Sequence, residues 1–364
     1  MTERHESSGH LNLNHSVEFN HSVEAVPPQQ SPLDFADEST EPSASLQTLA
    51  ILWARKYVSA VETRREAAQA IQSAAEHRSD EGRRLTAGRL RDQLSLASAQ
   101  AWSTTETLLA GELQAHDVNP SLIRPLEIAQ DSQRIFERAL DAYAQAIAPR
   151  KLSVLIGQDI GKVRQRYTAQ DPRVIGFVSL QFHHTGQTLL NGSSQPEQNL
   201  LQPYLKVMDD HMYMPLRETY LAAADHSPQS PKLQAVQRLL PISSTIAQLV
   251  CKKIRRVNSG YRSYSGSLRS ESVRSSSVRD VEMFQIYLCL SVLSSGIEAV
   301  QRELFPLCVM LYPPLGVKWS LVQDMLQALT WEMADQLDGD DMAVFIPYLR
   351  LFSDMFSREV FSVT

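Results

Sequence analysis

The chain has 364 residues, 43% of them hydrophobic and 21% charged, a composition typical of an ordinary soluble globular protein. This length exceeds one typical domain, so we expect two folded units and a tail. A net charge of −6 excludes a generally basic protein that coats nucleic acid or anionic lipid, although a local basic surface can still bind either.

Cysteine usage and hydropathy indicate a cytoplasmic protein. Cys251, Cys289 and Cys308 lie in apolar segments without paired spacing, which argues against a disulfide framework or zinc knuckle and indicates a reducing compartment. No apolar run is long enough to span a membrane, because prolines interrupt the best candidate. The N-terminus also has no apolar core of the signal-peptide type.

Residues 1–44 contain few large apolar side chains and many Ser, Glu, His and Pro residues. Such a stretch buries too little surface to offset its ordering entropy, so we predict a disordered tail. Its histidines are irregularly spaced, which favours a solvated tail over a metal-binding tract.

Residues 45–192 have helical patterning. Apolar residues such as Leu49, Trp53 and Val61 recur at three-to-four spacing, which predicts a helical domain of unknown role. The segment "NGSSQPEQ" (191–198) indicates a boundary. Because adjacent helical residues point about 100° apart, we expect one packed and one exposed histidine at His183–His184, not a metal site.

Residues 195–364 are again helical, which makes the predicted fold class all-α with an N-terminal helical bundle. A polar segment, "NSGYRSYSGSLRSESVRSSS" (258–277), precedes an almost wholly apolar helix. The segment "DGDDM" at Asp338 lacks the length and alternating ligands of a calcium loop. Acidic residues favour the positive end of a helix dipole, so we predict a helix start there.

The order of segments in this second half is distinctive. "SVRDVEMFQIYLCLSVL", "SSGIEAVQRELFPLCVMLYPPLGV", "KWSLVQDMLQAL" and "GDDMAVFIPYLRLFSDMFS" follow one another at similar spacing to that in one family. From about Pro203 to Phe361 the chain resembles the phycobiliproteins, the globin-like subunits of the phycobilisome, the light-harvesting antenna of cyanobacteria and red algae. The resemblance implies a globin-like domain over residues 195–364.

In that family a Cys-Xaa-Arg-Asp motif holds a linear tetrapyrrole, or bilin. The resemblance implies that Arg279 pairs with a pigment propionate and that Asp280 accepts hydrogen bonds from pyrrole nitrogens. Ser277 stands where the family has the cysteine that forms the thioether. A hydroxyl is far less nucleophilic than a thiolate, so we expect no covalent bilin and therefore no covalent cofactor.

The same residues have a purely structural interpretation. Asp280 would favour the dipole at a helix N-terminus, with Ser276 or Ser277 as the N-cap. Arg279 would then face solvent or pair with a neighbour.

A second candidate site is a run of basic residues interleaved with tyrosines and serines. It comprises Lys252, Lys253, Arg255, Arg256, Arg262, Arg269 and Arg274. Such a segment could bind phosphates and stack bases, or be phosphorylated. A solvated loop or a patch for an acidic protein partner are the alternatives, and we favour a protein partner over nucleic acid.

No nucleophile elbow, His-Glu-Xaa-Xaa-His or nucleotide-binding loop is present, so we expect a non-enzyme. The favoured hypothesis is a phycobilisome-related structural or regulatory protein that binds an antenna protein, reaches the cytoplasmic or stromal face of thylakoids through it, and is able to form homo-oligomers. The alternatives are a sensor of a non-covalent tetrapyrrole or carboxylate ligand, and a nucleic-acid-binding regulator that uses the basic segment.

Overall fold

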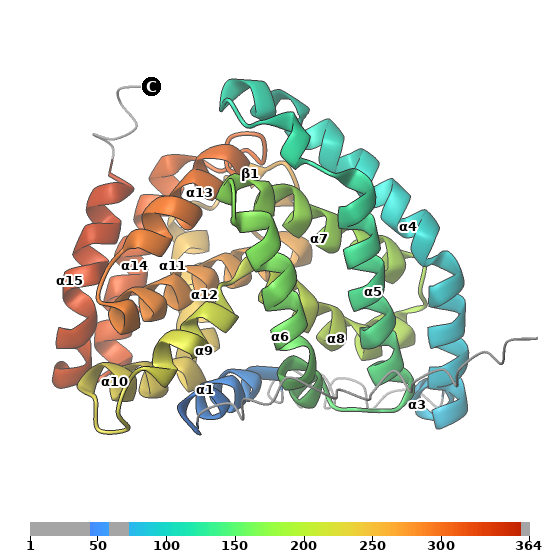
Figure 1. Ribbon diagram of the computed structural model, residues 1–364, viewed down its shortest axis with the longest axis horizontal. Helices are drawn as coiled ribbons and strands as arrows, with labels where there is room; N and C mark the ends of the chain where they lie inside the picture. The colour runs from blue at the N-terminus through green and yellow to red at the C-terminus, as the bar shows by residue number, and fades with distance from the viewer. Residues whose placement is uncertain (1–43, 58–72, 358–364) are drawn as a thin grey trace, which may run out of the picture. The chain divides into compact units, whose positions relative to one another are not determined.

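The computed structural model describes residues 44–57 and 73–357, which are almost entirely helical (Figure 1). The predicted tail lies outside these ranges except for Ala44. The α-helices are α1 (Ala44–Ala54), α3 (Ser73–Arg78), α4 (Asp80–Ala115), α5 (Pro125–Ala144), α6 (Pro149–Thr168), α7 (Ile175–Asn191), α8 (Gln195–Tyr213), α9 (Leu216–Ala224), α10 (Pro231–Leu239), α11 (Ser243–Val257), α12 (Glu271–Ser294), α13 (Phe305–Leu311), α14 (Trp319–Gln336) and α15 (Gly339–Met355). The all-α prediction is confirmed for this part of the chain.

The remaining elements are short. They are the 3-10 helices η1 (Pro120–Leu122), η2 (Pro172–Val174) and η3 (Leu240–Ile242), the π-helix η4 (Val300–Leu304), and the strands β1 (Arg262–Ser263) and β2 (Gly266–Ser267). The two strands pair antiparallel as a hairpin inside the predicted polar segment. The second half was expected to be purely helical, and this short hairpin is the exception.

Side-chain caps explain where several helices begin. The Ser79 side chain accepts a backbone hydrogen bond at the start of α4. Ser194 and Glu197 form a reciprocal capping box at the start of α8. Asp338 accepts a hydrogen bond from the Asp341 backbone N–H at 2.8 Å, which confirms the helix start predicted there.

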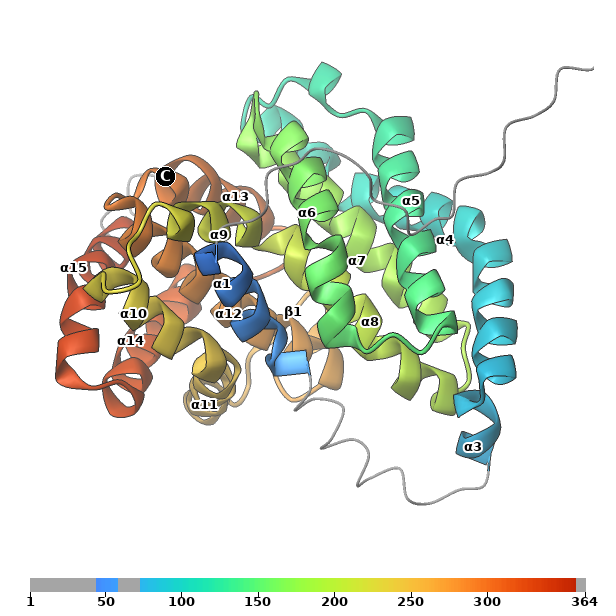
Figure 2. The same cartoon turned by 60° about the horizontal axis from the view of Figure 1, so that its bottom comes forward.

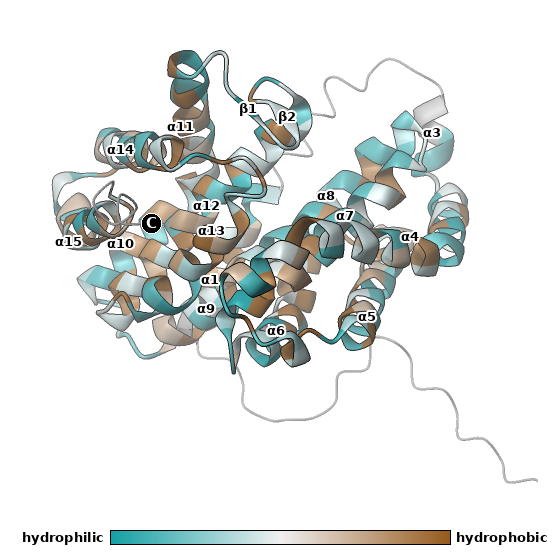
Figure 3. Ribbon diagram, turned by 90° about the horizontal axis from the view of Figure 1, so that it is seen from above, coloured by the Kyte–Doolittle hydropathy of each residue, from teal (hydrophilic) through white to brown (hydrophobic). Residues whose placement is uncertain are grey.

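Two groups of helices surround the candidate site. In one group α4 packs along α5 and α7, and α6 and α7 pack against α8. In the other, α12 lies against α9, α10, α11 and α15, while α11 packs on α14. Apolar residues concentrate on the inward faces of these helices (Figure 3). No helix in the described ranges has the length and apolarity needed to cross a bilayer.

The segment α1 packs against α9 and α6 (Figure 2). Just after it, the buried Lys56 ammonium lies 2.7 Å from Asp210 on α8 and 2.8 Å from Glu282 on α12. Burial lowers the pKa of Lys56, and the two carboxylates oppose that shift. This buried ion-pair network joins Lys56, in the first predicted domain, to two helices of the second, so it crosses the predicted boundary.

Buried apolar side chains from both predicted domains form one cluster, which includes Leu49, Phe136 and Phe284. The described residues, 44–57 and 73–357, belong to a single compact unit by their contacts. That residues 45–192 and 195–364 are two separate domains stays a prediction.

The helix that carries the Arg279–Asp280 pair begins earlier than the purely structural interpretation of this pair predicted. Its N-cap is Ser270 and its first residue is Glu271, so Asp280 lies in the third turn. The prediction that Ser276 or Ser277 caps this helix is therefore wrong. From Val281 to Leu293 every residue of α12 is buried, which confirms the predicted apolar helix.

Candidate functional site

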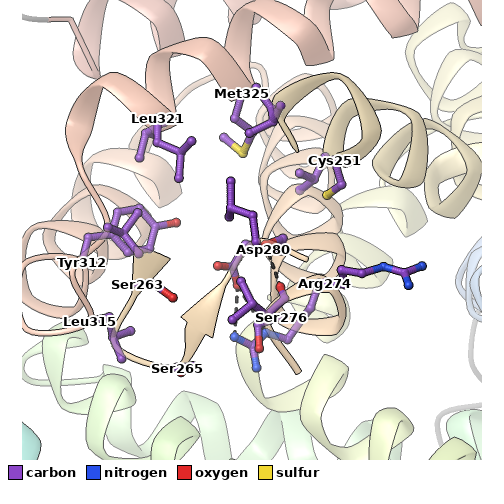
Figure 4. A pocket seen from close by; sticks show the side chains of 18 of the residues that line it. Cys251, Ser263, Ser265, Arg274, Ser276, Asp280, Tyr312, Leu315, Leu321 and Met325 are labelled. Atoms are coloured by element: carbon purple, nitrogen blue, oxygen red, sulfur yellow. Dashed lines mark hydrogen bonds and ion pairs between the residues drawn. The ribbon is translucent and has the colours of Figure 1, made fainter. Parts of the chain in front are cut away.

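A cavity of ≈ 160 Å³ opens beside the first three turns of α12. Its walls come from α7, the end of α8, α11, α12, α14, the region of the β1–β2 hairpin and the segment between α13 and α14. Ser277, Arg279 and Asp280 all line it, so the three ligand-binding positions taken from the family motif share one cavity. In Figure 4 Asp280 lies between Tyr312 on one side and Cys251 on the other.

Helical spacing brings the α12 residues to the cavity. Val273, Ser277 and Asp280 are separated by four and three residues, so their side chains lie on one face of the helix. The Ser277 hydroxyl donates a 2.7 Å hydrogen bond to the Val273 carbonyl one turn earlier. This bond holds the Ser277 hydroxyl against the backbone of its own helix.

Arg279 is a buried residue with three neighbours. Its guanidinium donates to Asp209 on α8 at 2.9 Å and to Asp280 at 3.1 Å, and it lies 3.7 Å from the centre of the Tyr213 ring. Burial opposes its charge, yet these neighbours raise the pKa of Arg279 well above its ordinary value. The alternative that Arg279 faces solvent is wrong, and its pairing with neighbours is confirmed.

Asp280 keeps unused hydrogen-bonding capacity. Arg279 donates only to its Oδ1 atom, and no described residue donates to Oδ2. The side chain is 27% exposed at the cavity. Burial raises the pKa of Asp280, and the Arg279 charge opposes this shift. Together Asp209 and Asp280 place two carboxylates against one guanidinium, so the site attracts an N–H donor.

Helix α7 contributes two histidines that the sequence did not connect with this site. His183 and His184 are both partly buried and both line the cavity, so the expectation of one packed and one exposed histidine is wrong. His183 Nδ1 lies 3.4 Å from Asp209 Oδ1. His184 Nε2 is buried without a hydrogen-bond partner among the described residues, and burial lowers the pKa of His184 to about 4. His184 is therefore neutral at pH 7.

The remaining walls are mainly apolar. They comprise Leu180, Val250, Cys251, Ile254, Leu268, Leu315, Val317, Leu321, Val322 and Met325. Burial raises the pKa of the Cys251 thiol to about 12, so this sulfur is protonated at pH 7 and weakly nucleophilic. An apolar enclosure with one carboxylate facing inward suits a flat, hydrophobic ligand that donates hydrogen bonds.

The β1–β2 hairpin forms the outer edge of the cavity. The Tyr264 backbone N–H donates to the Leu315 carbonyl at 2.8 Å, and the Tyr261 hydroxyl accepts from the Lys318 N–H at 2.8 Å. Gly316 has a φ of 67°, which favours glycine at the point where the hairpin meets this segment. The hairpin is thus fastened to the chain between α13 and α14.

The structure divides the predicted basic segment. Lys253 pairs with Glu332 at 2.6 Å, and Arg255 lines the cavity while donating to the Cys251 carbonyl. The other members are exposed, and they are Lys252, Arg256, Arg262, Arg269 and Arg274.

Other reactive side chains lie away from this cavity. Ser153 Oγ and His211 Nε2 are 2.8 Å apart, but both residues are only 2% exposed and neither lines it. Among the residues in the described ranges, no group of three or more His, Cys, Asp or Glu side chains is arranged to hold a metal ion.

Comparison with known proteins identifies no relative: no family model, no curated protein and no solved structure matches this chain.

Proposed function

We propose that the protein is a non-enzymatic, phycobiliprotein-related binding protein that holds a linear tetrapyrrole without a covalent bond. The observation that carries this proposal is the free Oδ2 atom of Asp280, which faces a largely apolar cavity at the position where the family's aspartate meets pyrrole nitrogens. A linear tetrapyrrole has flat, conjugated rings that suit the apolar walls. Its pyrrole N–H groups can donate hydrogen bonds to Asp280 Oδ2. Ser277 leaves the ligand without a thioether.

The size of the cavity limits how the ligand is held. At ≈ 160 Å³ it is smaller than the roughly 300 Å³ at the lower end of cavities that enclose drug-sized molecules. We therefore propose that part of the tetrapyrrole enters beside Asp280, while its remaining rings lie at the mouth near the hairpin. Arg279 is already paired with Asp209 and Asp280, so the ligand's carboxylates meet Arg255 and Arg274 at the cavity wall.

Titration of the full chain with biliverdin tests this proposal. We expect the visible absorption of biliverdin to shift and sharpen on binding, because a protein site restricts its conformations. Asp280→Asn should weaken binding at least ~10-fold, since hydrogen bonds to charged groups contribute about 1.5–3 kcal/mol. Asp335→Asn, at an exposed position on α14, is the matched control. An unchanged spectrum at saturating biliverdin would exclude a tetrapyrrole ligand.

A second candidate function is a structural or regulatory partner of the antenna without any pigment. The pairing of Arg279 within the protein favours it, because the guanidinium that the family offers to a propionate is already occupied. Purified phycobilisome subunits should then bind the chain with equal affinity in the presence and absence of biliverdin.

A further inference from the structure

Five positively charged side chains are exposed on the elements that border the cavity. They are Lys252 and Arg256 on α11, Arg262 and Arg269 in and after the hairpin, and Arg274 on α12. Within residues 44–57 and 73–357 none of the five has a carboxylate partner. We call these five residues the cationic face.

What distinguishes these five cations is how close together they lie in the chain. The net charge is −6, and several arginines elsewhere in the described ranges are paired, as Arg173 is with Asp171 and Arg164 with Glu303, whereas the exposed Arg150, Arg302 and Arg350 lie far apart in the sequence. Clustered charges of one sign create a local potential that attracts a partner of opposite charge. A merely solvated surface would not need to concentrate cations in an acidic protein.

Exposed apolar groups accompany the cations. Val257, the last residue of α11, is 78% exposed, and Tyr264 in the hairpin turn is 63% exposed. The backbone N–H of Tyr264 is fixed to Leu315, so this ring stands on an anchored turn. Tyrosine with surrounding charge is typical of protein interfaces, where aromatic residues supply affinity and a polar rim supplies specificity.

We propose that the cationic face is a docking surface for an acidic protein partner, with Tyr264 and Val257 as its apolar contacts. A single-stranded nucleic acid fits less well, because it requires successive aromatic platforms along a cationic track. Here Tyr264 is exposed, whereas the Tyr261 hydroxyl is engaged with Gly316 and Lys318. Apart from Arg274, which also lines the cavity, none of the five residues of the cationic face belongs to the proposed tetrapyrrole site.

Charge reversal with a matched control tests the proposal on the full chain. The test variant combines Arg256→Glu, Arg262→Glu and Arg269→Glu, and the control combines Arg150→Glu, Arg302→Glu and Arg350→Glu at exposed positions elsewhere. Both variants change the net charge equally. The probe is a fluorescein-labelled peptide of alternating glutamate and leucine, followed by fluorescence anisotropy at increasing salt.

We expect the test variant to bind the peptide ~10-fold or more weakly and to lose most of the salt dependence, while the control changes little. Tyr264→Ala should weaken binding without changing the salt dependence, because it removes only an apolar contact. Equal weakening in both charge variants would overturn the proposal. Tighter binding of oligothymidylate than of the peptide at matched charge would overturn it in favour of nucleic acid.

Discussion

The guanidinium of Arg279 on α12 lies 2.9 Å from the carboxylate of Asp209 on α8. Asp209 also faces His183 on α7 at 3.4 Å, so one carboxylate connects three helices. Burial works against the ionisation of Asp209, yet the charges of Arg279 and His183 hold its pKa well below the ordinary range. Arg279 therefore stabilises the packing of this chain.

Removal of that arginine should destabilise the protein strongly. Arg279→Met would remove the counter-charge that Asp209 and Asp280 share, and breaking such a buried pair costs about 3–5 kcal/mol. Urea unfolding measures the loss. Arg274→Met, at an exposed position of the same helix, should change the free energy of unfolding by no more than about 0.5 kcal/mol. A similar loss in both variants would contradict a structural role for Arg279.

Patterns within short segments predicted much of the fold. The apolar run after Asp280 identified the buried part of α12, and the acidic residues after Asp338 identified the start of α15. The site depended on contacts between distant residues. Asp209 and Arg279 are 70 residues apart, and nothing in either segment specifies the other. The part that the two histidines of α7 play in this site could not be predicted from the sequence. It follows from the packing of α7 against α8, which places His183 beside Asp209.

His184 makes stability depend on pH. Its pKa falls from 6.5 to about 4 on folding, chiefly through burial and also through the charge of His183, whereas Asp209 opposes the shift. Between pH 6.5 and 4 the unfolded chain binds a proton that the folded chain does not. Stability therefore rises with pH across this window.

His184→Gln should make the free energy of unfolding depend less on pH. At the acidic end it should recover about 1 kcal/mol of that free energy, a small amount because the imidazole is only partly buried. Urea midpoints at several pH values from 6.5 to 4 measure the effect. His211, whose pKa burial lowers to about 3, should leave a residual slope in the same direction. An unchanged slope in His184→Gln would show that its imidazole does not titrate as described.

Restoring the thiol should restore covalent attachment if the cavity accepts a bilin. In Ser277→Cys, sulfur would bond to the ethylidene carbon of phycocyanobilin as the carbon–carbon double bond is lost and the thiol proton passes to the pigment. Co-expression with a bilin attachment enzyme should give protein that stays coloured after denaturation. Ser275→Cys, at an exposed position of α12, is the control and should stay colourless. Colourless Ser277→Cys protein would argue against bilin entry beside Asp280.

The Cys251 thiol offers a direct readout of whether the cavity is occupied. Cys251 lines the cavity and is 8% exposed, whereas Cys289 and Cys308 are almost fully buried away from its walls. A pKa of about 12 makes alkylation of Cys251 by iodoacetamide slow at pH 7, but it should still be the first cysteine modified. Biliverdin should slow this alkylation further in proportion to occupancy, as measured by intact-protein mass spectrometry. Cys251→Ala should abolish the early modification, and a rate indifferent to saturating biliverdin would place the ligand outside this cavity.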